Sequence, residues 1–486
     1  MNMVSLDISK RSIGLDSVNV SFLRDEGTQA GKKPFPLVIT PRWESSLSFL
    51  TTWMEANRAW LDERLLQYGA VLIRGFEIDS GADMQKAMRS FQPKLNNTYR
   101  GTSPRNLIPG TEYIFSAAEV PVNYPIAQHL EMSFLPAPPK QLFFGCLQPS
   151  QSTGGETALA DFRKVYQDLP CDLRQKLLEK GVRYTRTHYK QGARFTYDVA
   201  SMLSWSELFG TSDKATVERM CAAEGTPVQW TGDDTFVSIT QASPYQLHPV
   251  TKEPVWFNHI QVFHWTTFTA ELWFSWKRTR DWRLLIHCFF VTCFCLIKYG
   301  MLGHRMSLHS TFGDGEEISV AEMNKIRHAI HRNMVFSRWE KGDVMLIDNF
   351  STSHGRQPTY DKGRKIVVAW ADPMVKTNEF VTNTTAVAIQ NEARIVVNES
   401  EFVHMENPQE RTPPSTLTKE ESDVLQEQLS TKNSILQNYG GMNPQDEIFE
   451  STILVMKRIV AEAERKSHKK SFSQPSLMHL SQVWES

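Results

Sequence analysis

Apolar residues recur along the chain at two spacings, one typical of helices and the other of strands. Between Trp43 and Tyr68 they follow helical spacing, with Leu61, Leu65 and Leu66 as part of one apolar stripe, and Gly69 ends the predicted helix. A strand is predicted directly after Gly69. A further strand is predicted over residues 140–147, and further helices over 166–181, 205–225 and 319–331, the last beginning at a Ser319/Glu322 capping box.

These elements predict three parts. Residues 1–42 mix charge, Gly and Pro without a clear period and are expected to form a lead-in. Residues 43–375 hold the regular strands and helices and are expected to form the main domain. Residues 376–486 are predicted to be a helical extension, with a boundary at Pro413-Pro414, a capping box over 418–421 and a helix over 444–465.

Composition narrows the class of protein. With 486 residues, 41% hydrophobic and 22% charged, the chain has the composition of a soluble globular protein. A net charge of −1 gives no reason to expect nucleic acid as a partner. The six cysteines show no metal-finger spacing and the chain begins without a signal-peptide core, so we expect reduced thiols and an intracellular, cytoplasmic location.

One segment stands out for its apolar character. Residues 284–297 are almost wholly apolar, within an insertion at about 265–310, and Arg283 and Lys298 flank them. Fourteen residues fall short of the roughly 20 that a membrane-spanning helix needs. The pattern favours a buried helix or a lid over the active site, then peripheral membrane contact, for which the nearby tryptophans are suited, and last a true span.

Candidate chemistry lies in His129-Leu130-Glu131 and in the later His354. A two-residue spacing places the imidazole and the carboxylate on the same side of an extended chain. Two histidines and one carboxylate are the ligand set that holds non-heme Fe(II) and leaves positions open. The pair alone is weak, because His404-Met405-Glu406 repeats it in a polar stretch, where we interpret it as surface.

The neighbouring motifs strengthen the first pair. They are the strand motif Gly69 to Phe76, the turn Gly154-Gly155-Glu156-Thr157, the strand 342–349 leading to His354, and Arg364 followed by an apolar strand. In this order they resemble the taurine dioxygenase and clavaminate synthase-like family of Fe(II)/2-oxoglutarate oxygenases, from about residue 69 to 372. Glu131 stands where Asp is commoner in the family, which changes reach but not charge.

The resemblance implies a mainly β fold with surrounding helices, built on a double-stranded β-helix (jelly roll). The residues alone predict only a mixed, strand-rich enzyme. It also implies His129, Glu131 and His354 as iron ligands, Thr157 and Arg364 as contacts of the cosubstrate 2-oxoglutarate, and O2 as oxidant. The expected reaction is oxidation of a C–H bond in a small, amino-acid-derived or carboxylated substrate by hydroxylation, desaturation or cyclisation, with succinate and CO2 as co-products.

Other interpretations stay open for the substrate and the class of protein. The resemblance implies Asn123 and Tyr124 as candidate substrate contacts, because related enzymes place such a contact just before the metal motif. Arg356 lies two residues after His354 and is a candidate contact for an anionic substrate group, with a structural salt bridge as the alternative. His328 and His331 are predicted to be exposed helix residues. A membrane-associated binding or scaffold protein that keeps the fold is the alternative to an enzyme, and a zinc hydrolase would leave Thr157 and Arg364 without a role.

Overall fold

The computed structural model describes residues 14–23, 35–99, 105–117, 120–135, 137–193, 198, 203–223, 225–232 and 234–373. All of them belong to one compact unit, Met1–Ile395. The predicted C-terminal extension, its boundary at Pro413-Pro414 and the His404/Glu406 pair lie outside these residues.

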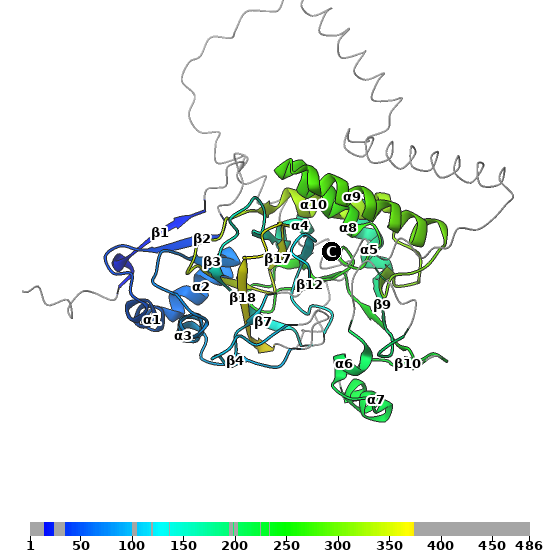
Figure 1. The fold of residues 1–486 in the computed structure, drawn as a ribbon, viewed down its shortest axis with the longest axis horizontal. Helices are drawn as coiled ribbons and strands as arrows, with labels where there is room; N and C mark the ends of the chain where they lie inside the picture. Colours follow the sequence, from blue (N-terminus) through cyan, green and yellow to red (C-terminus); the bar gives the residue numbers. More distant parts are fainter. Residues whose placement is uncertain are drawn as a thin grey trace, which may run out of the picture. The chain divides into compact units, whose positions relative to one another are not determined.

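A large, mostly antiparallel sheet forms one half of the core (Figure 1). Its strands, in spatial order, are β1 (Val18–Phe22), β2 (Leu37–Pro41), β3 (Ala70–Ile73), β16 (Val344–Asp348), β7 (Pro139–Gln148), β18 (Lys365–Pro373) and β4 (Leu95–Asn96), with β5 (Phe115–Ser116) paired to β18. Only β2 and β3 run parallel to each other among these pairs. The predicted strands after Gly69 and over 140–147 and 342–349 are confirmed.

A four-stranded antiparallel sheet forms the other half of the core. Its order is β15 (Met334–Val335), β8 (Thr157–Asp161), β17 (Thr352–Arg356) and β6 (Ile126–His129). Leu159 of β8 joins a cluster with Leu72, Leu142 and Val368 of the large sheet, so apolar side chains fill the space between the sheets. Two facing antiparallel sheets of this kind form the predicted jelly-roll core.

Helices cover the outer faces of both sheets because alternate strand residues point away from the interior. Val71 and Ile73 point outward and pack with residues of α1 (Leu47–Ala56), α2 (Arg58–Tyr68) and α3 (Gly81–Phe91). Ala158 and Ala160 do the same against α4 (Phe162–Asp168), α5 (Cys171–Lys180) and α10 (Val320–Arg332). The predicted capping box of α10 is present, with Ser319 and Glu322 bonded reciprocally.

Four predicted features differ in detail from the structure. The helix over 43–68 breaks into α1 and α2 at Asn57, which leaves helical geometry and bonds its side chain to the Trp53 carbonyl. The helix over 166–181 breaks at Leu169-Pro170, because proline lacks the N–H that a helix interior requires. The segment 205–225 holds two helices, α6 (Trp205–Phe209) and α7 (Lys214–Ala223). The lead-in contains β1 and β2, both part of the large sheet.

Smaller strands and the insertion complete the described part. A third sheet has the order β10 (Gln229–Trp230), β11 (Phe236–Ala242), β9 (Val182–His188) and β14 (Leu308–Phe312), and β12 (Tyr245–Leu247) pairs with β13 (Pro254–Trp256). The insertion between β13 and β14 folds as α8 (Thr267–Thr279), α9 (Trp282–Cys295) and a π-helical turn (Leu296–Met301). The continuous run Trp282–Met301 is, by length and composition, sufficient to cross a membrane.

A buried ion pair joins β3 to β16. Arg74 donates from Nε and Nη2 to the two carboxylate oxygens of Asp343 at 2.9 and 2.7 Å, and also bonds the Arg338 carbonyl. The Asp343 side chain is fully buried. Burial raises its pKa, and Arg74 opposes that effect.

We therefore expect Arg74→Ala to lower the free energy of unfolding by about 3–5 kcal/mol, because it leaves a buried carboxylate without its partner. Lys341→Ala is the matched control, since Lys341 pairs with Asp79 at the surface and such a pair contributes less than about 1 kcal/mol. Urea unfolding followed by circular dichroism measures both. Equal, small losses would show that the Arg74–Asp343 pair does not join the two strands as described.

Candidate metal centre

Strand register brings the two histidines together. β17 lies between β6 and β8, and its His354 is directly opposite His129 on one side and Leu159 on the other. Directly paired residues of an antiparallel ladder point to the same face of the sheet. His129 and His354 therefore both enter the space between the two sheets, although 225 positions separate them in sequence.

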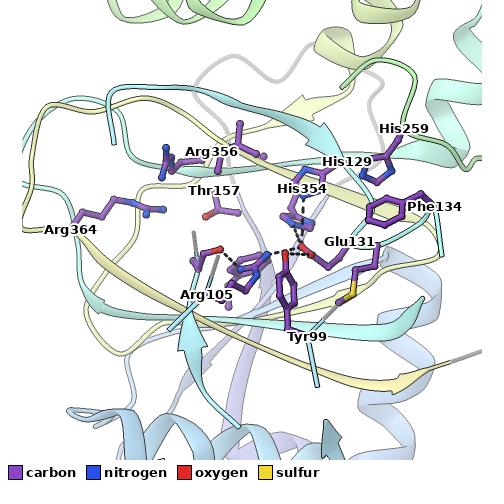
Figure 2. Close-up of a pocket in the computed structure, with 15 residues that line it drawn as sticks. Tyr99, Arg105, His129, Glu131, Phe134, Thr157, His259, His354, Arg356 and Arg364 are labelled. Carbon is purple, nitrogen blue, oxygen red and sulfur yellow. Dashed lines mark hydrogen bonds and ion pairs between the residues drawn. The ribbon is translucent and has the colours of Figure 1, made fainter. Parts of the chain in front are cut away.

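Glu131 completes a cluster of three possible metal ligands (Figure 2). Its Oε2 lies 3.3 Å from Nε2 of His354 and 3.7 Å from Nε2 of His129. One ligand atom from each side chain falls within 4.8 Å of the other two. The chain turns sharply after Glu131, where Met132 takes the left-handed conformation. In the described part of the chain this is the one group of three such residues close enough to share a metal ion.

Protonation favours metal binding at this cluster. Burial, together with the neighbouring His129, lowers the pKa of His354 to about 4, so its imidazole is neutral near pH 7. Burial alone would raise the pKa of Glu131, but Arg105 and the hydrogen bonds with the two histidines hold it well below its usual value. The Nδ1 of His129 lies 2.9 Å from the Ala127 carbonyl, which directs Nε2 towards the cluster.

Two residues that the sequence analysis did not identify position Glu131. The side chain of Asn349 accepts from the Glu131 N–H at 2.7 Å and donates to the Glu131 and Pro139 carbonyls. Arg105 donates to Glu131 Oε2 at 3.0 Å and lies over the ring of Tyr99. Asn349 lies within the motif that precedes His354, so the sequence offered a signal for it. Arg105 lies in an irregular segment, where no hydrophobic periodicity or motif indicates a functional residue.

Thr157 and Arg364 lie at one end of the same cavity, beyond the histidines (Figure 2). Arg364 donates from Nε to the Gly155 carbonyl at 2.6 Å, and burial lowers its pKa to about 10, so it stays charged near neutrality. Among the described residues no carboxylate forms an ion pair with it. The Thr157 hydroxyl accepts from Trp339 at 3.2 Å.

The Gly-Gly turn is required by close packing. Gly154 has a φ of +87°, and a Cβ there would lie 2.0 Å from the Pro358 carbonyl oxygen. Gly155 has a φ of +81°, and its Cβ would meet Arg364 at 3.1 Å. Any side chain at this turn would therefore displace the backbone that carries Thr157 or the guanidinium beside it.

Arg356 has a structural role in the loop before β6, although it also lines the cavity. Its guanidinium donates to the carbonyls of Val120, Pro121 and Tyr124 at 3.0, 2.6 and 2.9 Å. A structural salt bridge would need a carboxylate, whereas these partners are backbone carbonyls. The predicted structural role is therefore present, but the predicted salt bridge is wrong. Burial, with repulsion from Arg364, lowers its pKa to about 9.

Asn123 and Tyr124 do not line the cavity. Tyr124 packs its ring against His287 of α9, with centroids 4.5 Å apart, and against Phe268 of α8. The opposite end of the cavity from Arg364 is formed instead by Phe134 and His259, which the sequence analysis missed. His259 bonds Ser133 and lies against both His129 and Phe134. On α10, His328 is exposed, whereas His331 pairs with Glu271 at 2.9 Å.

The cavity opens to solvent, and the empty space inside it and at its mouth is about 670 Å³. Three arginines line it, Arg105, Arg356 and Arg364, against one carboxylate, Glu131. The cavity therefore suits anionic small molecules, bound beside a metal ion.

Comparison with known proteins agrees with this geometry. Residues 38–370, more than half of the chain, match the family model described as taurine catabolism dioxygenase TauD, TfdA family. The chain belongs to this family and is a 2-oxoglutarate-dependent non-heme iron dioxygenase. Fe(II), 2-oxoglutarate and O2 are accordingly its metal, cosubstrate and oxidant.

Relatives cover most of the matched region. The dapdiamide synthesis protein DdaC of Enterobacter agglomerans is 29% identical over 322 residues, which span 66% of this chain and 87% of DdaC. A clavaminate synthase-like protein of Arabidopsis thaliana is 27% identical over 350 residues, 69% of this chain and 93% of the relative. The solved structure of PvcB from Pseudomonas aeruginosa is 14% identical, with a TM-score of 0.42 and coverage of 75% of this chain and 96% of PvcB.

The hydrogen bonds between the Asn349 side chain and the backbone of Glu131 lead to a testable prediction. Asn349→Asp removes the amide donor to the Glu131 and Pro139 carbonyls, so the carboxylate of Glu131 loses its fixed position. We expect Co(II), used as an air-stable substitute for Fe(II), to bind roughly ten- to a hundredfold more weakly by calorimetry. Asn19→Asp, at an exposed amide that bonds the Pro41 carbonyl, is the control and should leave affinity unchanged. Wild-type affinity in Asn349→Asp would show that Glu131 does not depend on these hydrogen bonds.

Proposed function

We propose that the protein oxidises a C–H bond of a small, carboxylated, amino-acid-derived molecule, with His129, Glu131 and His354 as the Fe(II) ligands. One observation supports the proposal most directly. His129 and His354, which face each other in the strand ladder, share a cavity with Glu131 and with Arg364. Arg364 is charged and has no carboxylate partner among the described residues.

The residues present fit Fe(II). Two histidines and one carboxylate are the ligand set of non-heme iron oxygenases, and they occupy one side of the site. When bound, the iron uses 2-oxoglutarate and O2 to oxidise a substrate C–H bond, releasing succinate and CO2. Arg105 and Asn349 hold Glu131 in place, and Phe144 packs against the ring of His354, with centroids 5.0 Å apart.

Arg364 and Thr157 are proposed to bind 2-oxoglutarate. Arg364 is a buried cation that can pair with a carboxylate distant from the iron, and arginine does so with two parallel hydrogen bonds. Thr157 lies on β8 directly opposite Arg356 in the β17 ladder, which places its hydroxyl between Arg364 and the histidines (Figure 2). The Gly154-Gly155 turn holds Arg364 against β8 and so fixes this end of the cavity.

The substrate is proposed to bind at the other end, beside Phe134 and His259. Arg186 of β9 lies over the ring of Phe134, 5.2 Å from its centroid, and burial lowers the pKa of Arg186. No carboxylate pairs with Arg186 in the described part of the chain. Arg186 does not line the cavity itself but lies over Phe134, which does. A cation so close to this end favours a carboxylated substrate, and the resemblance to a dapdiamide synthesis protein supports a biosynthetic role. The oxidation leads to hydroxylation, desaturation or cyclisation.

Metal ligands and cosubstrate contacts should respond differently to substitution. His354→Ala removes an iron ligand and should abolish succinate formation at every 2-oxoglutarate concentration. Arg364→Ala should keep iron but lose a charge-assisted bidentate partner, at about 1.5–3 kcal/mol per hydrogen bond, which corresponds to a roughly ten- to more than hundredfold higher KM for 2-oxoglutarate. High 2-oxoglutarate should therefore partly restore Arg364→Ala. Equal loss in both variants without such recovery would contradict the role of Arg364, and full activity of His354→Ala would contradict the iron assignment.

A carboxylate on the substrate makes a second prediction. Across a panel of N-acylated amino acids, the free acids should stimulate succinate formation at least tenfold more than their carboxamides, and Arg186→Gln should remove most of that preference. Arg183→Gln is the matched control, because Arg183 lies on the same strand but three positions away, on its opposite face. Equal stimulation by acids and amides, or an unchanged preference in Arg186→Gln, would contradict this part of the proposal.

A further inference from the structure

The helical run Trp282–Met301 has an apolar face that the described residues leave exposed. The run is 20 residues long, the mean hydropathy of its most apolar 18-residue window is 1.8, and no Asp, Glu, Lys or Arg occurs between Leu284 and Ile297. At 1.5 Å per residue it extends for about 30 Å. The exposed apolar side chains along it are Trp282 at 66%, Leu285 at 38%, Ile286 at 47%, Phe289 at 50%, Phe290 at 60%, Ile297 at 47% and Met301 at 53%.

These exposed residues form one stripe. They recur at intervals of three and four, with the main gap between Phe290 and Ile297, and therefore lie on one side of the helix. We call this stripe the α9 apolar face. Leu302, 65% exposed, continues it beyond the helix end. Contiguous apolar surface of this extent, including two neighbouring phenylalanines, is uncommon on a soluble monomer and marks an interaction site.

The opposite side of the same helix is fixed to the domain. Leu284, Cys288, Val291, Cys295 and Tyr299 are buried in a cluster with Leu272 of α8. His287 packs on Tyr124 in the loop before β6. Because a third of the run is buried against the protein, crossing a bilayer would require breaking these contacts. The geometry therefore suits a helix lying in the plane of a membrane surface, with one face buried in protein and the other in lipid.

Charge around the α9 apolar face is positive. Residues 277–305 contain six Lys or Arg and a single acidic residue, Asp281, in a chain whose net charge is −1. Three of the six cations pair with carboxylates: Arg283 with Asp281 at 2.7 Å, Arg278 with Glu156 at 2.8 Å and Arg305 with Glu317 at 3.1 Å. Lys277 and Arg280 lie over Trp273 and Trp276 before the stripe, and Lys298 lies over Phe294 near its far end.

Cations at both ends of an apolar stripe, with tryptophans at its beginning, match the layered chemistry of a lipid surface. Phosphate and carboxylate headgroups attract the cations, tryptophan partitions to the interface, and the stripe enters the acyl boundary. A second protein copy would place the same cations against each other. We propose that the α9 apolar face is an in-plane anchor that docks the protein on an anionic membrane surface. This inference does not depend on the proposed substrate or reaction.

Vesicle binding by the full chain tests the proposal. Sedimentation with phosphatidylcholine vesicles containing 30% phosphatidylserine should carry the protein down, phosphatidylcholine alone should bind at least tenfold more weakly, and high salt should weaken binding to the anionic vesicles. The double variant Phe289→Ser/Phe290→Ser should lose at least tenfold in binding while keeping its melting temperature. The matched control is Trp43→Ser/Val250→Ser, at equally exposed positions outside α9, and should bind as the wild type does.

Four outcomes would overturn the anchor. The first is absence of binding to anionic vesicles, as expected if another segment of the chain covers the face. The second is undiminished binding by Phe289→Ser/Phe290→Ser. The third is self-association, by analytical ultracentrifugation, that this variant abolishes without any vesicle binding, which would assign the face to a second copy. The fourth is retention on vesicles after alkaline carbonate washing, which would indicate a spanning helix rather than an in-plane one.

Discussion

The position of β17 between β6 and β8 determines the site. One ladder sets His354 opposite His129, and the other sets Arg356 opposite Thr157. A slip of one residue would turn every side chain of β17 to the other face, removing His354 from the cavity. Gly355 permits the close approach that this register needs, because a Cβ there would lie 2.6 Å from the Ile126 carbonyl oxygen. The ligand geometry is thus a property of the sheet, and the metal binds to side chains that the fold has already brought together.

Electrostatics in the cavity depend on the same arrangement. Glu131 stays ionised under burial because Arg105 lies 3.0 Å from it, and His354 stays neutral because burial penalises its charged form. Glu131 and His354 are therefore in the protonation states that a divalent metal needs. Arg364, which we propose binds 2-oxoglutarate, lies apart from the carboxylate of Glu131, so in this proposal the cosubstrate and Glu131 do not compete for one cation.

The sequence allowed correct prediction of the features that depend on short, continuous segments of the chain. The strands around residues 70, 140 and 345 were predictable because their apolar runs are bounded by glycine or polar residues, and the cluster of His129, Glu131 and His354 was predictable because the motifs around it occur in a fixed order. The helix break at Asn57 was missed because the apolar stripe continues through it. Arg105 and His259 were missed because only the folded chain brings their irregular segments against the metal ligands. The substrate assignments for Asn123 and Tyr124 relied on sequence proximity, whereas their loop turns outward to α8 and α9.

That same loop connects the insertion to the metal centre. Its residue Tyr124 holds His287 of α9 through its ring and Arg356 of β17 through its carbonyl, and the loop continues directly into β6 and His129. A buried arginine with three backbone acceptors is costly to detach, since each lost hydrogen bond would leave a buried polar group unsatisfied. The α8–α9 insertion is therefore joined to the ligand-bearing strand by a short, rigid path. The insertion also reaches the other end of the cavity, because Arg278 of α8 pairs with Glu156 beside Thr157 at 2.8 Å.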